Sequence, residues 1–513
     1  MTTAETVSPS EATAEEIKIG ALIDHGAELK RGAWTNAIAL LASNFRGIFT
    51  FLVARLLGPA ALGTFSVAWA TTDLLSKIGI FGLDNTIITF IARSEAAGDR
   101  GRSRTLFRLA VSLAVLQCTL IAAVSVAAIR LWGNRLSLHP QMVAALSVML
   151  CAMPGVALYR INTAVSRGMK VMRHDIFSRG ITETIGTTLA FLVALGFGLK
   201  TFAPQIAAIA GTAASGVVAL ILASSLFRLA PPSPAAISYL TESRRLLAYA
   251  APISAYDLLN AFIVRLDVIM LGCFIGRAPG VTLPVVGIYG AVVEVAGGLR
   301  KVNQAFNPIF APIIARMTAH GEQERAAVVF SRVAQWMLWF LLPLVAVMVL
   351  AGSAILSIYG PAFRQGAMWL SIVAIACATN AFVSLAETVI MVQKPRLNLL
   401  NSVITCVVAL VANLWLIRRF GVTGAAFGIL LPYIVQGVLR YRALRLVFRW
   451  RNPWADIGRP FIAAVVAITP ALICRGIVAG IAGQAIAAAA FLLVYFAAWQ
   501  YCRTPRAEQL LTQ

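Results

Sequence analysis

The chain has 513 residues, 59% of them hydrophobic and 12% charged, with a formal net charge of +22. Soluble domains have roughly 25% charged residues, so the composition excludes a soluble globular protein and predicts a polytopic membrane protein. The net charge does not indicate nucleic-acid binding, because the basic residues form short clusters between apolar runs. Seven cysteines without CxxC spacing and four scattered histidines give no metal-site pattern. No enzyme or cofactor motif is present, so we expect a non-enzymatic membrane protein without a cofactor.

The first 32 residues contain six acidic residues and no apolar core, so they predict a cytosolic tail and not a signal peptide. The stretch Ala33–Arg93 that follows is long enough for two transmembrane helices. About 20 helical residues cross the ~30 Å hydrocarbon core of a bilayer. Gly58 and Pro59 predict a tight turn between the two helices.

This hairpin contains charged side chains, each of which is costly at membrane depth unless it faces a wet cavity or a partner. They are Arg46, Asp73, Lys77 and Asp84. On a helical wheel the last three fall within about 40° of one another, and Trp69 shares their face. A polar face on an otherwise apolar helix predicts a substrate path through the membrane.

Twelve further apolar runs predict transmembrane helices, which makes fourteen in all. They lie near residues 105–130, 141–164, 176–198, 203–227, 246–276, 284–315, 326–350, 365–391, 397–417, 422–447, 458–479 and 481–502. If the N-terminus is cytosolic, 29 basic residues lie in cytosolic segments and 9 in the opposite loops. The positive-inside rule therefore predicts that both termini are cytosolic.

An internal repeat relates the two parts of the chain. GTFSVAWATTDLLSKIGIFG (63–82) aligns with GIYGAVVEVAGGLRKVNQAF (287–306) at a constant offset of 224, which pairs Gly63 with Gly287 and Lys77 with Lys301. Six spans per repeat is an even number, so the repeat predicts an all-α protein with two parallel six-helix lobes related by a pseudo-two-fold axis. The predicted segments are a cytosolic tail (1–32), an N-lobe (33–227), a cytosolic linker (228–245), a C-lobe (246–447), and two additional helices with a cytosolic C-terminus (448–513).

The hairpin sequence ARLLGPAALGTFSVAWATTDLLSKIGIFGLDNTIITFIAR resembles the opening of the polysaccharide transporter family. These proteins are the oligosaccharide-lipid flippases of the multidrug/oligosaccharidyl-lipid/polysaccharide (MOP) superfamily. RLDVIMLGCFIG, MVQKPRLNLLNSV and FGVTGAAFGILLPYIVQ resemble the family's second half, so the resemblance covers residues 33–450. It implies two six-helix lobes in a V around a central cavity, with alternating access. It also implies a polyprenyl-pyrophosphate-linked saccharide as cargo, moved to the outer leaflet of a bacterial inner membrane.

A pyrophosphate carries about two negative charges, which cationic side chains in a cavity of low dielectric would match. The candidate substrate-binding residues are Arg46, Lys77, Arg265, Arg300, Lys301 and Trp69. The cations would hold the phosphates, and the Trp69 indole would stack on a sugar ring. The alternatives are that these charges pair internally, as Asp73 and Lys77 at i,i+4 would, or snorkel to the surface, and that Trp69 only packs.

Carboxylates inside a membrane commonly take part in proton or sodium coupling. The candidates for such coupling are Asp73, Asp84, Asp257, Asp267, Glu294 and Glu387. Arg160 and Glu183 lie near the predicted cytosolic ends of their spans, so we interpret them as interface anchors. The arginine-rich run from Arg440 to Arg451 is interpreted as a cytosolic determinant of topology.

These observations favour a flippase for lipid-linked oligosaccharides that serves O-antigen (lipopolysaccharide) or exopolysaccharide assembly. A cation-coupled multidrug antiporter of the same superfamily is an alternative, but five buried basic residues fit cationic drugs poorly. A glycan polymerase or ligase is a second alternative, disfavoured by the short outside loops, and a scaffold of glycan assembly is a third. The expected partners are the lipid-linked oligosaccharide, membrane lipids, a coupling proton or sodium ion and glycan-assembly proteins, with no nucleic acid.

Overall fold

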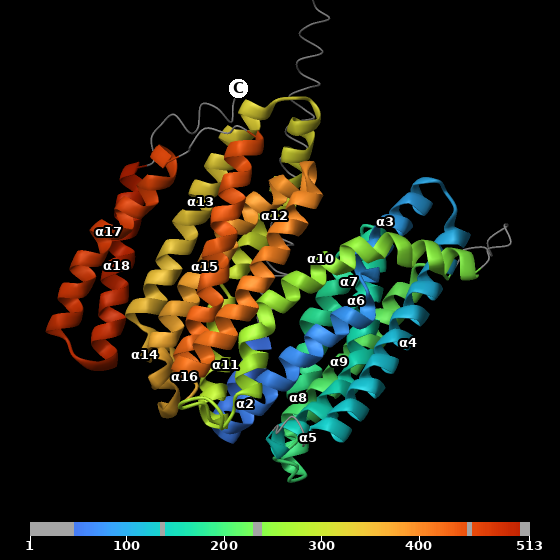
Figure 1. Cartoon of the computed structure of the whole chain (residues 1–513), viewed down its shortest axis with the longest axis horizontal. Helices are drawn as coiled ribbons and strands as arrows, with labels where there is room; N and C mark the ends of the chain where they lie inside the picture. Colours follow the sequence, from blue (N-terminus) through green and yellow to red (C-terminus); the bar gives the residue numbers. More distant parts are fainter. Residues whose placement is uncertain (1–45, 134–138, 229–238, 449–453, 503–513) are drawn as a thin grey trace, which may run out of the picture.

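The computed structural model of the chain describes residues 46–133, 139–228, 239–448 and 454–502, which form helices joined by turns (Figure 1). The predicted tail, the first part of the first span and most of the predicted linker lie outside these ranges. Ten of the described helices are long and apolar enough to cross a membrane. The prediction of an all-helical membrane protein is confirmed, whereas the number fourteen stays a prediction.

The helices follow one another along the chain with short connections. The first half of the described chain contains α2 (Arg46–Ile80), α3 (Leu83–Ala96), α4 (Arg100–Trp132), α5 (Pro140–Met149), α6 (Met153–Gly168), α7 (Arg173–Asp175), a π-helix η3 (Ile176–Thr182), α8 (Glu183–Gly196) and α9 (Ala203–Ser225). The second half contains α10 (Tyr239–Cys273), α11 (Leu283–Gly297), α12 (Arg300–Ala319), α13 (Gln323–Leu350), α14 (Gly352–Ser357), α15 (Ala367–Gln393), α16 (Pro395–Phe448), α17 (Trp454–Ile477) and α18 (Gly480–Cys502).

Two of these elements are each a pair of helices joined at a glycine. Gly58 in α2 has φ 79° and Gly421 in α16 has φ 56°, in the left-handed region that glycine adopts without strain. The predicted turn at Gly58 is therefore confirmed. It separates a short helical segment that begins at Arg46 from a longer one that begins at Pro59.

Two helix breaks divide segments that the sequence predicted as single helices. α2 ends at Ile80, because Phe81 and Gly82 have φ values of 53° and 69°, so Asp84 lies on the separate helix α3. The prediction that Asp84 shares a helix face with Asp73 was therefore wrong. The predicted span 284–315 is likewise divided, since α11 ends at Gly297 and α12 begins at Arg300.

Figure 1 shows two groups of helices, α2 to α9 and α11 to α18, that meet near α2, α10 and α11 and diverge toward the opposite end. The α3–α4 and α12–α13 connections, which the positive-inside count places in the cytosol, lie at the diverging end. α17 and α18 pack on α13 at the outer side of the second group.

α2 crosses α11 through glycines, without side chains between the backbones. A Cβ atom on Gly63 would collide with the backbone of Leu283 and Gly287, and a Cβ atom on Gly287 would collide with the backbone of Pro59 and Gly63. Residues 59 and 283, like 63 and 287, differ by the 224 positions of the sequence repeat. The contact is therefore reciprocal. Gly63 meets Leu283, which is the repeat counterpart of Pro59, and Gly287 meets Pro59 itself.

α10 connects the two groups and contacts both. Leu246 and Ala250, near its start, are fully buried in the hydrophobic core formed by α3, α4 and α6. Its later turns pack against α16 of the second group. The first turns of α10 therefore pack with the first half, and the predicted start of the C-lobe at residue 246 stays a prediction.

Candidate functional site

Asp73 of α2 lies between two arginines at the junction of the two helix groups. Its Oδ1 accepts a hydrogen bond of 2.6 Å from Arg160 of α6, and its Oδ2 lies 3.0 Å from Nη2 of Arg265 of α10. The Nε–H of Arg265 also donates to Oδ2. One carboxylate therefore holds two guanidinium groups, one from each half of the chain.

A second set of charged residues begins at Lys77, one helical turn after Asp73 on α2. Lys77 lies 3.6 Å from Asp84 of α3, and Asn85 donates a 2.7 Å hydrogen bond to Asp257 of α10. Asp257 also interacts electrostatically with Lys77 and Asp84. We call this set, together with Asp73, Arg160 and Arg265, the central network.

The central network contains three basic and three acidic side chains, and it joins α2, α3, α6 and α10. The structure thus shows Lys77 and Arg265 paired internally, although Lys77 pairs with Asp84 and not with Asp73. Pairing of this kind has a physical reason, since an isolated charge is costly in a medium of low dielectric.

Asp267 and Arg300 lie in a different cluster inside the second half. Asp267 is only 1% exposed and accepts a 2.7 Å hydrogen bond from the hydroxyl of Tyr289. Arg300 interacts electrostatically with Asp267 and Tyr433. Because Arg300 begins α12 after the break at Gly297, it reaches this buried cluster, whereas its neighbour Lys301 is half-exposed.

Glu387 of α15 is paired with Arg440 of α16, whose side chain is 1% exposed. The distance from Arg440 Nη2 to Glu387 Oε2 is 2.8 Å, and Nη1 also donates to the carbonyl oxygen of Val383. Arg440 is therefore held inside the protein and is not available to anionic lipid, while the cytosolic position of the basic run stays a prediction. Glu294 is exposed on α11 and lies apart from these three clusters, and the side chain of Arg46, the first residue of α2, lies outside the described atoms.

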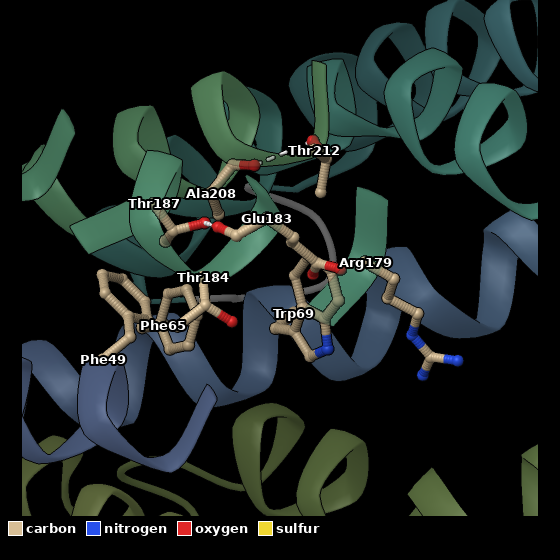
Figure 2. A pocket seen from close by; sticks show the side chains of 9 residues that line it. All are labelled: Phe49, Phe65, Trp69, Arg179, Glu183, Thr184, Thr187, Ala208 and Thr212. Atoms are coloured by element: carbon tan, nitrogen blue, oxygen red, sulfur yellow. Dashed lines mark hydrogen bonds between the residues drawn. The ribbon is translucent and has the colours of Figure 1, made fainter. Parts of the chain in front are cut away.

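A cavity of about 40 Å³ lies within the first half, between α2, α8 and α9 (Figure 2). Phe49, Phe65 and Trp69 form its aromatic side, and Glu183 and three threonines contribute polar atoms. The cavity has room for a few water molecules and not for a sugar ring. Trp69 is 7% exposed and its ring stacks on Phe65. In this conformation Trp69 is therefore packed inside the protein, as expected if it does not stack on a sugar.

Arg160 and Glu183 are the residues that sequence reasoning missed. The structure places Arg160 in the central network and Glu183 in the wall of the cavity, so neither is an interface anchor. α6 continues to Gly168, two turns beyond Arg160, which explains why a span ending near 164 misplaced it. The polar run ITETIGTT around Glu183 was an available signal in the sequence. The π-helix just before it is seen only in the structure, and π-helices often mark functional sites.

Comparison with known proteins identifies relatives at the level of sequence and fold. The family described as "Polysaccharide biosynthesis protein" matches residues 29–318, more than half of the chain. The probable flippase AglR of Haloferax volcanii is 26% identical over 204 residues, which cover 39% of this chain and 41% of AglR. The match thus spans about two-fifths of that relative's length.

Two kinds of solved transporter share the fold. The lipid II flippase MurJ in an inward closed conformation superposes with a TM-score of 0.66 at 10% identity, covering 91% of this chain and 98% of MurJ. A multidrug resistance MATE family transporter of the MOP superfamily, in an inward-facing conformation, gives 0.64 at 14% identity, covering 80% and 98%. These identities show a common fold, and the resemblance noted in the sequence is confirmed at that level.

Proposed function

The chain belongs to the family of polysaccharide biosynthesis proteins, and on that basis we propose that it is a flippase for polyprenyl-pyrophosphate-linked oligosaccharide. In this proposal the cargo moves across a bacterial inner membrane and serves O-antigen or exopolysaccharide assembly. The observation that carries the proposal is the position of Asp73 between Arg160 and Arg265. Two guanidinium groups that converge on one anion form a site for a phosphate group.

In the proposed mechanism, Asp73 occupies the place of the cargo's phosphate while the site is empty. The single carboxylate offsets part of the charge of the two guanidinium groups, which would otherwise repel each other more strongly in a medium of low dielectric. An arriving pyrophosphate offers more charge and more acceptor oxygens, so it replaces Asp73 between Arg160 and Arg265. Lys77 and Lys301 add positive charge along the path, and the prenyl tail stays in the bilayer.

This exchange gives a reason for proton coupling. Once the phosphate has displaced Asp73, the Asp73 carboxylate lies in the membrane without Arg160 and Arg265 beside it. An uncompensated buried carboxylate takes up a proton, because the neutral form is cheaper to bury. Cargo binding and proton uptake are thereby linked, and release of that proton on one side of the membrane would make the cycle directional. Asp84 and Asp257, close to Lys77, are the further coupling candidates in the network.

The helix arrangement supports alternating access in this proposal. Two six-helix lobes related by a pseudo-two-fold axis would cross at Gly63 and Gly287, and fourteen spans would place both termini in the cytosol. The diverging end of the two groups would then face the cytosol, ready for cargo from the inner leaflet (Figure 1). Glycan-assembly proteins would act before and after the flipping step.

A multidrug antiporter is the second candidate, favoured by one observation. The basic residues of the central network are balanced by acidic ones, so the network as a whole does not exclude cationic cargo. The two functions predict different phenotypes when the gene is deleted.

Deletion of the gene followed by analysis of lipid-linked saccharides separates them. A flippase mutant should accumulate complete lipid-linked repeat units on the cytosolic leaflet, with unchanged sensitivity to cationic drugs. Complementation with wild type or with Arg442→Ala, an exposed residue outside the network, should clear the repeat units, and Arg265→Gln should not. Drug hypersensitivity without such accumulation would establish the antiporter instead.

A further inference from the structure

A groove of about 610 Å³ runs along the first half between α4 and α9. Each of these helices packs against α6 but not closely against the other, so Leu158 of α6 forms the floor of the groove. Val111, Val115 and Leu116 of α4 line one wall and Leu220 of α9 lines the other. Figure 1 shows α4 at the outer side of the first helix group, and Leu116 is more than half exposed, so the groove opens toward the bilayer.

One end of this groove is charged and polar. Arg108 of α4 and Ser224 of α9 both line it there. The rings of Phe107 of α4 and Phe227, two residues after the end of α9, stack with centroids 5.2 Å apart, which holds this end of α9 beside α4. Arg108 is exposed and forms no ion pair with any acidic side chain in the described part of the chain.

The length of the groove matches one leaflet of a bilayer. From Arg108 to Thr119, a rise of 1.5 Å per residue gives a length of about 17 Å along α4. One leaflet of the hydrocarbon core is about 15 Å deep. The charged end is the predicted cytosolic end, because residues 93–108 contain five basic and two acidic side chains.

We propose that this groove is a binding site for an anionic phospholipid of the cytoplasmic leaflet. One acyl chain lies along Val111 and Val115 over Leu158, and the phosphate is held by Arg108 with the Ser224 hydroxyl. The net positive charge of the adjoining segment selects a lipid with net negative charge over a zwitterionic one. A lipid held here fills the space between α4 and α9, each of which packs against α6.

The geometry separates this site from the path of the proposed cargo. Leu158 and Arg160 are two residues apart on α6 and therefore point about 160° apart around the helix axis. Arg160 faces Asp73 in the central network, so α6 itself stands between the network and the groove. The proposed headgroup site at Asp73 and this groove therefore lie on opposite sides of α6, and the charged end and the one-leaflet length of the groove favour a phospholipid as its occupant.

A photo-crosslinker identifies the occupant directly. The full-length protein carries benzoylphenylalanine in place of Val115 and is reconstituted into vesicles of phosphatidylcholine with about 20% phosphatidylglycerol. The vesicles are irradiated, and the mass of the lipid adduct on the protein is measured. We expect a phosphatidylglycerol adduct above the proportion of that lipid in the vesicle. Adducts in proportion to the vesicle composition would mean annular lipid only and would overturn the proposal. A prenyl adduct when the same variant is irradiated in cells would mean that the groove holds cargo, which would also overturn it.

Matched variants test the two contacts. Arg108→Gln should lower the preference for phosphatidylglycerol about fivefold, the effect of one arginine near an anionic surface. Arg130→Gln, at the other end of the same helix, is the charge control and should leave it unchanged. Leu158→Trp should fill the groove and abolish the adduct, whereas Leu120→Trp on the exposed face of α4 should not. If Arg108→Gln destabilises the protein, Arg108→Lys should retain the preference, and equal loss in both would contradict the proposal.

Discussion

Asp73 and Arg265 form an ion pair of 3.0 Å that connects the two halves of the chain, although they are 192 residues apart in sequence. The second arginine on the same carboxylate, Arg160, comes from the first half. Any movement that separates the two halves at this point must break the pair with Arg265 or carry Asp73 away from Arg160. The proposed cargo site is therefore also a contact between the two halves of the chain.

Asp73→Asn should increase the affinity for polyprenyl pyrophosphate while slowing export. The variant removes the anion that competes with the phosphate, and one charge interaction at 4 Å with an effective dielectric of about 20 is worth about 4 kcal/mol before desolvation. We expect at least tenfold tighter binding of the purified protein and loss of most export in cells. Binding and export that fall together would instead indicate a structural role for the carboxylate.

Lys77→Ala and Lys301→Ala should each reduce flipping severely, by about tenfold or more, at unchanged protein level. In the proposed mechanism each lysine supplies a positive charge along the path of the headgroup, so Lys→Arg at either position should retain partial function. Export of labelled polysaccharide per cell measures the effect, with Arg442→Ala as the control that transports normally. Wild-type export by both alanine variants would show that the cationic path is wrong.

Gly287→Leu should destabilise the folded protein by about 3 kcal/mol or more, because the added side chain would enter the backbone of α2 at Pro59 and Gly63. Thermal unfolding of the detergent-solubilised protein followed by size-exclusion chromatography reads this loss. Gly196→Leu is the matched control, since a Cβ atom there meets nothing within 4 Å. Equal stability of the two variants would contradict the close crossing of α2 and α11.

The topology can be tested with cysteines introduced into a variant that lacks all seven native cysteines. Ala97→Cys and Arg442→Cys, both exposed, should resist an impermeant thiol reagent in intact cells, and Gln365→Cys should react. This pattern follows from cytosolic termini with fourteen spans. Labelling of position 97 from outside would show that the chain has the opposite orientation in the membrane.

His174 should make the stability of the protein depend on pH. It is buried between α6 and η3 with its Nδ1 3.0 Å from the Ser166 hydroxyl, and burial with the neighbouring Arg173 lowers its pKa below the ordinary 6.5. As pH falls through 6.5, the unfolded chain gains a proton that the folded chain does not, so stability falls with decreasing pH. His174→Gln should remove this component from a melting curve measured between pH 5 and 8.

Sequence patterns predicted the features that depend on local chemistry. Gly58 was recognised as a break because glycine before proline favours a turn, and the offset of 224 that pairs Gly63 with Gly287 recurs in the contact between them. The apolar runs predicted long membrane helices, ten of which are found within the described ranges. These signals need only the residues within one helix or one repeat.

The partners of the charged residues could not be predicted in the same way. Lys77 had Asp73 one turn away, yet Asp73 is held by Arg160 and Arg265, and Lys77 reaches Asp84 across the turn at residues 81 and 82. Which pair forms is decided by how helices distant in sequence approach each other. A helical wheel contains no information about that approach.

The reciprocal crossing of α2 and α11 bears on how such a chain could arise by duplication. Contacts in which residue i meets the copy of j, and j meets the copy of i, are those that two identical subunits form in a dimer. A single half-length chain with one such glycine would already supply both sides of the crossing. Fusion of two copies would preserve the joint and free each copy to diverge, as Arg160 and Asp73 on one side and Arg265 on the other have done.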